Sequence, residues 1–576
     1  MARSGHSTRS VCCIIFTLMQ DVAQSRDANL SVTTCRRGNM SVKDLSTVSR
    51  QDQVETTSIC IVGAGAAGLV LAQSLVARGL DVVVLESGGA QIDDEVEALN
   101  AIDNANGRWT GAFRSRCRGI GGTSQLWGGR CIPISTSECE ARPYLGDLGW
   151  PFRLQQLDRY TSEVETLLKL DHSPFDQLDG GGLPDNDEDF DCHWAKWPRF
   201  ADCNLSLLLR KDMRTSRRWR IWSNATVTDW ELDTDNGRIR SLTARNKTGN
   251  QVRVFAQHFV LAAGTVETTR LLLWLRRSSN DRALARCQVL GRYFQDHLDI
   301  SAATVSRENA TATNRLFGYR FSNNVRRSMH LELSRATQQQ AQVGSAFAYI
   351  TMDLENSSLN AIKSVARRIQ RGQINPGEIA RLSVQLKLLT QSLLWRMARR
   401  QLFVPADAGF KLHICAEQAP AWDNSITLSP RHDMFGVPLP RIKWTPTLPD
   451  EQTLRTAVAA IDRFWNRQGW NQLAPLQWSA AIRNPRARLI DLAEDYYHPS
   501  GSARMGTDPS TSVVNANLTC HDIPNLSALS AATFPRAGSA NPTFTIMRMA
   551  LRLADHLEAS LAHGKPEAVA AKMSAA

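Results

Sequence analysis

Three glycines and one glutamate between residues 63 and 86 have the types and spacing that are typical of a dinucleotide-binding site. Gly63, Gly65 and Gly68 form a Gly-x-Gly-x-x-Gly turn, and Glu86 follows Gly65 by 21 positions. The first glycine permits a tight turn, the second lets the backbone approach a pyrophosphate, and the third lets a helix pack closely. Glu86 would accept hydrogen bonds from a ribose, and its charge disfavours a 2′-phosphate and hence an NADP-type ligand. This fingerprint alone does not separate FAD from NAD.

The elements around this turn must form a βαβ unit. Residues 58–62 (SICIV) and 81–85 (DVVVL) are apolar, β-branched runs that predict buried strands, and residues 69–77 between them have helical spacing. The start of that helix would offer free N–H groups and partial positive charge to phosphates. Further along, 254–261 predicts a strand that enters a turn, and 265–275 predicts a helix.

The last predicted helix has the clearest boundary of all. Asn541 is a favoured N-cap residue, and Pro542 suits the first helical position. The helix carries one apolar stripe, which predicts a face packed on a core. The stripe consists of Ile546, Met549, Ala550, Leu553 and Leu557.

Composition narrows the class of protein. The 576 residues are 43% hydrophobic and 21% charged, which is typical of a globular protein with two or more cores. The net charge of +11 is spread out, without aromatic residues among basic runs, so no nucleic-acid partner is expected. The twelve cysteines include no C-x-x-C pair and no zinc spacing, which predicts no metal site and favours thiols in a reducing compartment.

The N-terminal segment, residues 1–55, is polar and irregular and predicts a disordered leader. Residues 11–19 (VCCIIFTLM) form a short apolar run that is too short to cross a bilayer, and no transmembrane segment is predicted elsewhere. We expect a cytoplasmic protein, with a secreted or periplasmic location as the alternative if the leader is a signal peptide. A basic, Leu-rich stretch at 355–402 predicts helices with a charged solvent face, and a contact with a membrane surface or a partner is the less favoured alternative.

Several segments, in order along the chain, resemble the glucose-methanol-choline (GMC) superfamily of oxidoreductases. The resemblance covers about residues 55–560, and the loop at 121–129 most resembles the sugar-oxidising branch that includes pyranose oxidase. The segments that carry it are 86–89 (ESGG), 121–129 (GGTSQLWGG), 261–270 (LAAGTVETTR), 291–297 (GRYFQDH), 417–420 (EQAP) with 425–428 (SITL), 498–506 (HPSGSARMG) and 534–543 (FPRAGSANPT).

This resemblance implies an α/β fold: a Rossmann-like FAD-binding domain with an inserted α+β substrate-binding domain built on an antiparallel sheet. The expected boundaries are 56–145, 215–300 and 490–560 for the discontinuous FAD-binding domain, 146–214 and 301–489 for the substrate-binding domain, and 561–576 for a flexible tail.

The resemblance also implies that the cofactor is FAD. Some members of the sugar-oxidising branch bind it covalently through a histidine just before the loop tryptophan. Leu126 occupies that place, so non-covalent FAD is expected. A second departure is Ser530-Ala-Ala, where relatives often carry an acidic residue. Besides the glycine turn and Glu86, the implied cofactor contacts are Gly122, Thr123, Ser124, Trp127, Gly128, Val227, Ala263, Gly264, Pro542 and Thr543.

Two residues of the C-terminal motifs could carry the chemistry that the family performs, which is hydride removal from an alcohol carbon. A neutral imidazole accepts a proton near neutral pH, so His498 is the expected base. The Asn541 amide would hold the alcohol oxygen. Other histidines, including His258, His297 and His413, are interpreted as structural.

The expected reaction is oxidation of a CH–OH group of an alcohol or carbohydrate, with oxygen, a quinone or a redox protein as electron acceptor. A lyase resembling the hydroxynitrile lyases, which share this fold and use the flavin structurally, is the alternative. A non-catalytic FAD-binding protein is a third hypothesis, against which the retention of His498 and Asn541 argues.

Overall fold

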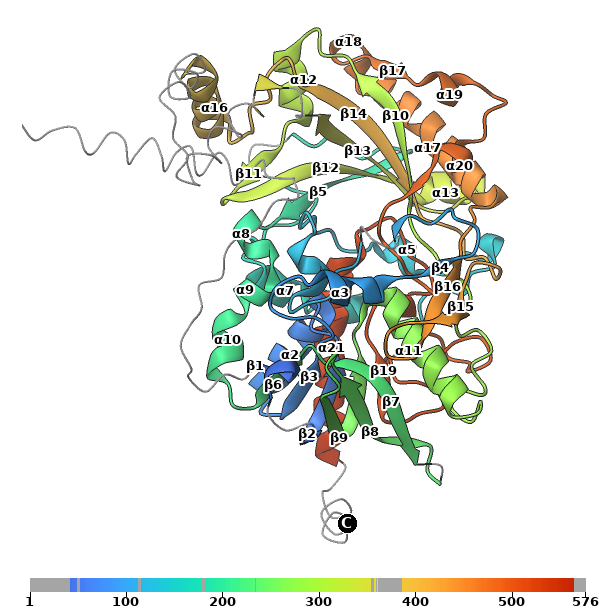
Figure 1. The fold of residues 1–576 in the computed structure, drawn as a ribbon. Helices are drawn as coiled ribbons and strands as arrows, with labels where there is room; N and C mark the ends of the chain where they lie inside the picture. Colours follow the sequence, from blue (N-terminus) through green and yellow to red (C-terminus); the bar gives the residue numbers. More distant parts are fainter. Residues whose placement is uncertain are drawn as a thin grey trace, which may run out of the picture.

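The computed structural model describes residues 42–48, 52–111, 115–178, 182–233, 235–353, 357–358, 360 and 386–563. Two large sheets lie one above the other in Figure 1, with a smaller three-stranded sheet beside their junction. The smaller sheet joins β15 (Ser425–His432), β16 (Pro438–Lys443) and β4 (Asp103–Asn104).

The lower sheet holds the predicted βαβ unit. Its core is parallel, because β2 (Asp52–Val62) lies between β3 (Val82–Leu85) and β9 (Gln251–Leu261) and runs in the same direction as both. Residues 59–62 of β2, 82–85 of β3 and 259–261 of β9 are all buried, as their continuous apolar runs predict. The sheet is completed by β1 (Val42–Asp44), β6 (Trp219–Ser223), β19 (Leu526–Ala528) and the antiparallel pair β7 (Thr226–Asp233) and β8 (Arg238–Arg245).

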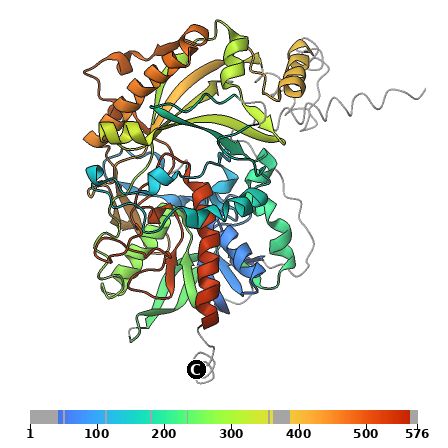
Figure 2. The same cartoon turned by 180° about the vertical axis from the view of Figure 1, so that it is seen from behind.

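Three helices position the ends of these strands. Helix α2 (Ala66–Ala77) begins at the glycine turn, three residues earlier than the apolar spacing predicts, and α11 (Gly264–Ser278) follows β9. Helix α21 (Pro542–His563) begins at Pro542 as predicted and packs along α2. Figure 2 shows α21 running the length of the lower sheet. Its predicted stripe is buried except at Ile546, which is half-buried.

The upper sheet is antiparallel. Its central strands are β12 (Val325–Leu333), β13 (Ala346–Asp353), β14 (Gly409–Ala416) and β10 (Leu298–Val305), in that spatial order. Strand β5 (Phe190–Trp197) pairs with β12, while β11 (Arg320–Ser322), β17 (Leu476–Trp478) and β18 (Glu494–Asp495) extend the edges. Helix α17 (Leu448–Arg467) packs against one face of β13 and β14. The opposite face of these strands is directed toward the lower sheet (Figure 1).

The predicted fold class, a Rossmann-like parallel sheet with a separate antiparallel sheet, is confirmed. The boundary expected at residue 55 is wrong, because β1 and the first residues of β2 already belong to the lower sheet. Their polar residues pair at the sheet's exposed end, so they lack the apolar run that marks a buried strand. Residues 1–41 and 564–576 lie outside the described residues, as does most of 355–402, of which α16 (Leu386–Arg399) is helical.

Candidate active site

The glycine turn is built as the fingerprint requires. Gly63 has a φ of +105°, and a Cβ there would lie 2.6 Å from the carbonyl oxygen of Ala262. A Cβ on Gly68 would lie only 1.9 Å from the carbonyl oxygen of Gly63, so α2 packs against the turn with no room for a side chain. Gly65, in contrast, has its Cβ direction open except for Gly122 Cα at 4.0 Å. These contacts fix a bare backbone surface, the kind of surface that lets phosphates approach closely.

A second loop closes over this turn. The Gly121 amide donates a 2.8 Å hydrogen bond to the carbonyl of Ala64. Gly122 has a φ of +52°, and a Cβ on it would lie 2.8 Å from Gly65 Cα. The loop at 121–129 therefore approaches the dinucleotide turn backbone to backbone, with Thr123 exposed beside it.

Glu86, at the end of β3, organises the rim of the pocket. Its carboxylate accepts hydrogen bonds from the backbone amides of Ala64 (2.7 Å), Gly88 (2.9 Å) and Gly119 (3.0 Å). Burial raises the pKa of Glu86, and these donors act in the opposite direction. The residue thus ties three loops together, and it also lines the pocket that a ribose would enter.

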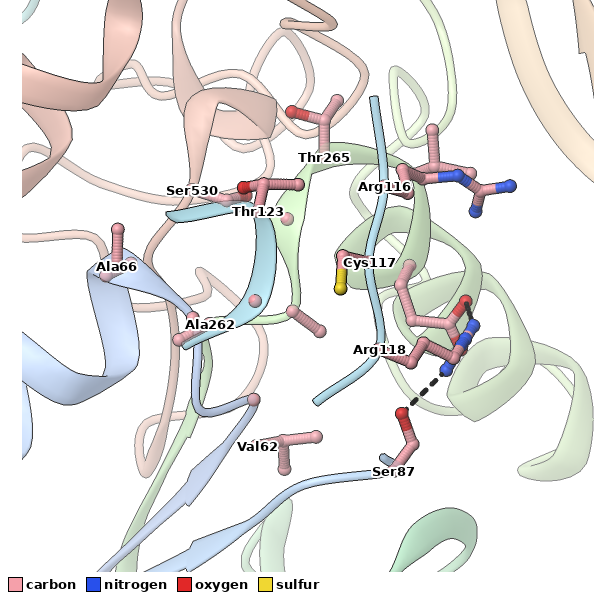
Figure 3. Close-up of a pocket in the computed structure, with 18 of the residues that line it drawn as sticks. Val62, Ala66, Ser87, Arg116, Cys117, Arg118, Thr123, Ala262, Thr265 and Ser530 are labelled. Atoms are coloured by element: carbon pink, nitrogen blue, oxygen red, sulfur yellow. Dashed lines mark hydrogen bonds and ion pairs between the residues drawn. The ribbon is translucent and has the colours of Figure 1, made fainter. Parts of the chain in front are cut away.

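One pocket connects these features, with about 1320 Å³ of empty space including the part open to solvent. Figure 3 shows side chains from several loops around it. Arg118 lies at one end, where it bonds Ser87 Oγ (3.0 Å) and Glu267 (2.9 Å). Of the predicted residues, the lining includes Gly63, Gly65, Glu86, Gly122, Thr123, Val227, Ala263, Gly264, His498, Pro542 and Thr543.

Five predicted site residues are not among the residues that line this pocket. Gly68 serves helix packing, as described above. Ser124 Oγ bonds the Gly121 carbonyl at 2.6 Å and shapes the loop, while Trp127 donates its indole N–H to the Cys203 carbonyl at 2.8 Å. Gly128 is exposed. Asn541 faces His498 instead.

The lining also contains residues that the motifs did not single out. Arg116, Cys117 and Arg118 form a segment that crosses the pocket beside Ser87 and Thr265 (Figure 3). They belong to no glycine motif. The run of three polar side chains just ahead of the loop at 121–129 was the only hint.

His498 lines the pocket and is in contact with Asn541. Asn541 Nδ2 lies 3.2 Å from His498 Nε2, so the amide donates to the ring nitrogen. The Oδ1 of Asn541 is buried and has no partner among the described residues. Burial, with smaller contributions from His297 and Arg130, places the pKa of His498 well below its usual range. The imidazole is therefore neutral at physiological pH.

His297 lies on the other side of the His498 ring and fixes its tautomer. The two Nδ1 atoms are 2.8 Å apart, and His297 Nε2 lies 2.6 Å from the Gly538 carbonyl oxygen. A carbonyl only accepts, so His297 Nε2 carries the proton. Burial lowers the pKa of His297 to about 4, so its Nδ1 is an acceptor. His498 must then donate from Nδ1, which leaves its Nε2 lone pair free to act as a base.

Asp296 anchors the backbone of both His297 and His498. Its Oδ1 accepts the backbone amides of His297 and His498, each at 2.8 Å, and its Oδ2 accepts the indole N–H of Trp109 at 2.9 Å. Burial, together with Asp495, raises the pKa of Asp296 to about 8. His297, interpreted from sequence as structural, is thus part of the site. His258, by contrast, bonds Ser527 Oγ in the lower sheet at 2.9 Å.

The inner face of the upper sheet presents a polar row toward His498. His193 pairs with His330, and Tyr349 pairs with His413, across neighbouring strands β5, β12, β13 and β14. Tyr496 bridges the row to the catalytic candidate: its ring centroid is 5.8 Å from Tyr349 and 5.0 Å from His498. This row includes His413, which the sequence interpretation took as structural.

The described residues contain no group of three His, Cys, Asp or Glu side chains that could hold a metal ion. In the same part of the chain, no helix has the length and apolar character needed to span a membrane.

A profile of the GMC oxidoreductase family matches residues 420–550, and a profile of an NAD(P)-binding Rossmann-like domain matches 61–90. The chain is 23% identical over 422 residues to 2-methyl-1,2-propanediol dehydrogenase of Mycolicibacterium austroafricanum, covering 72% of this chain and 64% of that protein, less than two thirds of its length. It is 25% identical over 572 residues to 6'''-hydroxyparomomycin C oxidase of Streptomyces lividus, covering 88% of this chain and 92% of that protein.

Among solved structures, pyridoxine 4-oxidase from "Mesorbium loti" has the same fold, with a TM-score of 0.51 and 18% identity over 87% of this chain and 99% of that one. The two curated relatives are a diol dehydrogenase and an aminoglycoside oxidase by name, and neither is a pyranose oxidase. Over residues 420–550, and in the order of the glycine turn, the loop at 121–129 and the two C-terminal motifs, the chain is thus similar to the GMC oxidoreductases.

Proposed function

We propose that this protein oxidises a CH–OH group of an alcohol or carbohydrate, using FAD as the electron acceptor. The observation that carries the proposal is the pairing of His498 Nε2 with Asn541 Nδ2 at the end of the dinucleotide pocket. One basic lone pair and one amide donor at this spacing match the two needs of an alcohol oxygen, which must release a proton and be held.

His498 and Asn541 have different roles at the substrate hydroxyl group. The substrate oxygen takes the place between the two side chains, donates its proton to His498 Nε2 and accepts a hydrogen bond from Asn541 Nδ2. The free Asn541 Oδ1 accepts a second substrate group. Because His297 accepts from His498 Nδ1, the proton that arrives at Nε2 creates an imidazolium still held at its other nitrogen.

The pocket suits FAD. Its bare glycine backbone fits a pyrophosphate, Glu86 fits a ribose, and Pro542 and Thr543 bring the start of α21 to the far end. When bound there, FAD supplies the acceptor for a hydride. The partial positive charge of the α21 N-terminus stabilises negative charge that develops next to it.

We propose that FAD is bound non-covalently. Leu126 stands where a linking histidine would be required, and its side chain is 53% exposed and not among the residues that line the pocket. A hydrocarbon side chain forms no bond to a flavin, so acid precipitation should release all of the cofactor.

The substrate class extends to sugars by analogy with the aminoglycoside oxidase among the relatives. We also propose that the protein is related to the sugar-oxidising branch of the family. We propose that oxygen, a quinone or a redox protein accepts the electrons, and that the protein is cytoplasmic. The nine cysteines within the described residues are all free thiols, which fits a reducing compartment.

The test is anaerobic reduction of the purified flavoprotein by a panel of diols, polyols and sugars, followed by absorbance. His498→Ala should lower the rate of flavin reduction by about 100- to 10,000-fold, since a general base contributes that much. His432→Ala, at an exposed position on β15, is the matched control. Unchanged reduction in His498→Ala refutes the mechanism, and cyanohydrin cleavage without bleaching would favour the lyase.

A further inference from the structure

A buried cation without a counter-charge lies beside the proposed reaction centre. Arg130 follows the loop at 121–129 and is 7% exposed. Its guanidinium carbon lies 4.9 Å from the ring centroid of Phe347 and 5.3 Å from that of Tyr349, on the inner face of the upper sheet. Among the residues that the structure describes, no carboxylate forms an ion pair with it. Burial without a partner is costly for a charged group, so such a charge calls for an anion.

The hydrogen bonds around Arg130 show which kind of partner is missing. Its Nη2 lies 2.9 Å from His330 Nδ1 and donates to it, because a guanidinium has no acceptor. His330 is neutral, since burial lowers its pKa well below the usual range, so its proton sits on Nε2. Within the described residues, neither Arg130 Nη1 nor His330 Nε2 has a partner, although both atoms are buried. Two neighbouring groups thus offer donors and no acceptor.

The position of this pair relates it to the hydroxyl site. Tyr349, which lies under Arg130, is in ring contact with Tyr496, and Tyr496 is in ring contact with His498. The charge of Arg130 also contributes to the lowered pKa of His498. An anion on Arg130 would offset that effect and make His498 a stronger base only when substrate is present.

We propose that Arg130 and His330 form a carboxylate subsite, and that the substrate is a hydroxycarboxylic acid whose alcohol group lies at His498. This inference rests on the proposed function. A carboxylate oxygen can accept from the free Nη1 of Arg130, while His330 holds the guanidinium in place through Nδ1. In the reaction the hydroxyl proton passes to His498, the hydride passes to bound FAD, and the product is the corresponding oxo acid, with the carboxylate unchanged.

The test compares paired substrates in which a carboxylate replaces a CH₂OH group: glycerate with glycerol, lactate with propane-1,2-diol, and gluconate with glucitol. In the wild-type holoenzyme, kcat/KM for anaerobic flavin reduction should favour the acid of at least one pair by about 10- to 100-fold, the range expected for a charge-assisted hydrogen bond. Arg130→Met should abolish that preference, mainly through KM. His330→Phe, which keeps the ring stacked on Phe347, should reduce it less.

Arg307→Met is the matched control. Arg307 also stacks on an aromatic ring of the upper sheet, Phe410, but its guanidinium donates to backbone carbonyls. It should keep the acid preference. If the neutral alcohols are preferred throughout, or if Arg130→Met lowers turnover of acids and alcohols by the same factor, the carboxylate subsite is refuted and Arg130 serves the flavin or the fold.

A binding measurement separates this inference from the proposed function and does not depend on a variant. Acetate and acetamide, neither of which is an alcohol, are titrated into the wild-type holoenzyme while the flavin spectrum is followed. Acetate should bind at least about tenfold more tightly than acetamide. Equal dissociation constants overturn the subsite even if alcohols are oxidised, and a failure of every alcohol to reduce the flavin overturns the proposed function while the acetate preference still stands.

Discussion

Replacing His297 by phenylalanine tests whether this residue sets the proton position on His498. Phenylalanine keeps a planar ring but removes the acceptor at Nδ1 and the donor to the Gly538 carbonyl. His498 Nδ1–H then loses its partner, and the tautomer with the proton on Nε2, which cannot act as a base, is no longer disfavoured. The variant therefore lowers the share of His498 that is in the tautomer able to act as a base, without touching the substrate.

The size of the effect follows from the hydrogen bonds. A neutral hydrogen bond contributes about 0.5–1.5 kcal/mol, and leaving a buried partner unsatisfied costs about 1–3 kcal/mol. The barrier should rise by about 1–3 kcal/mol, which corresponds to a rate of flavin reduction about 5- to 150-fold slower. KM should change much less than kcat, because His297 is separated from the substrate by the His498 ring.

Stopped-flow reduction across pH distinguishes this role from a merely structural one. His297 contributes to the lowered pKa of His498, so His297→Phe should raise that pKa and move the acid limb of the rate profile to higher pH. His297→Gln, whose amide carries both an acceptor and a donor, should recover part of the rate. A wild-type rate with an unshifted profile in His297→Phe, at full flavin content, refutes the reasoning, as does equal loss in the two variants.

Three further outcomes are expected. Gly68→Ala places a Cβ 1.9 Å from the Gly63 carbonyl and should destabilise the fold by about 1–3 kcal/mol in thermal unfolding, whereas Gly65→Ala should fold normally and lose FAD affinity; equal melting temperatures would contradict this. Flavin reduction should stay on its plateau below pH 6.5, because the lowered pKa keeps His498 neutral there, and an acid limb above about 6.5 would count against it. Asn541→Ala should lower kcat about 100- to 1000-fold, measured at saturating substrate, and a normal kcat would exclude the amide from the reaction.

Local patterns predicted the cofactor half of the molecule well. Three features depend only on neighbours within a few residues, so the local sequence predicts them directly. They are the turn at Gly63–Gly68, the strand before it and the start of α21 at Pro542. The start of the sheet was harder to predict, because the first residues of β2 are mostly polar and lack the continuous apolar run of a buried strand.

The proposed reaction centre was only half predictable. His498 and Asn541 were found through motifs. In contrast, His297 and Asp296 contact His498, and Arg130 contacts His330, across separations of 200 to 202 residues. No local sequence pattern predicts contacts between residues so far apart in the chain. The histidines of the upper sheet, such as His193 and His330, could not be predicted for another reason. A histidine in a strand cannot be told from an ordinary buried residue until its neighbours on the adjacent strands are known.

The wide separation of the strands in the lower sheet has a consequence during synthesis. β2 and β3 lie before residue 90, but β19 and the pocket residues Ser530, Pro542 and Thr543 emerge more than 400 residues later. At translation rates of about 5–20 residues per second, the first βαβ unit waits about 20–90 seconds for its missing wall. During that interval the pocket is incomplete, so FAD can stabilise the fold only after these last residues have emerged.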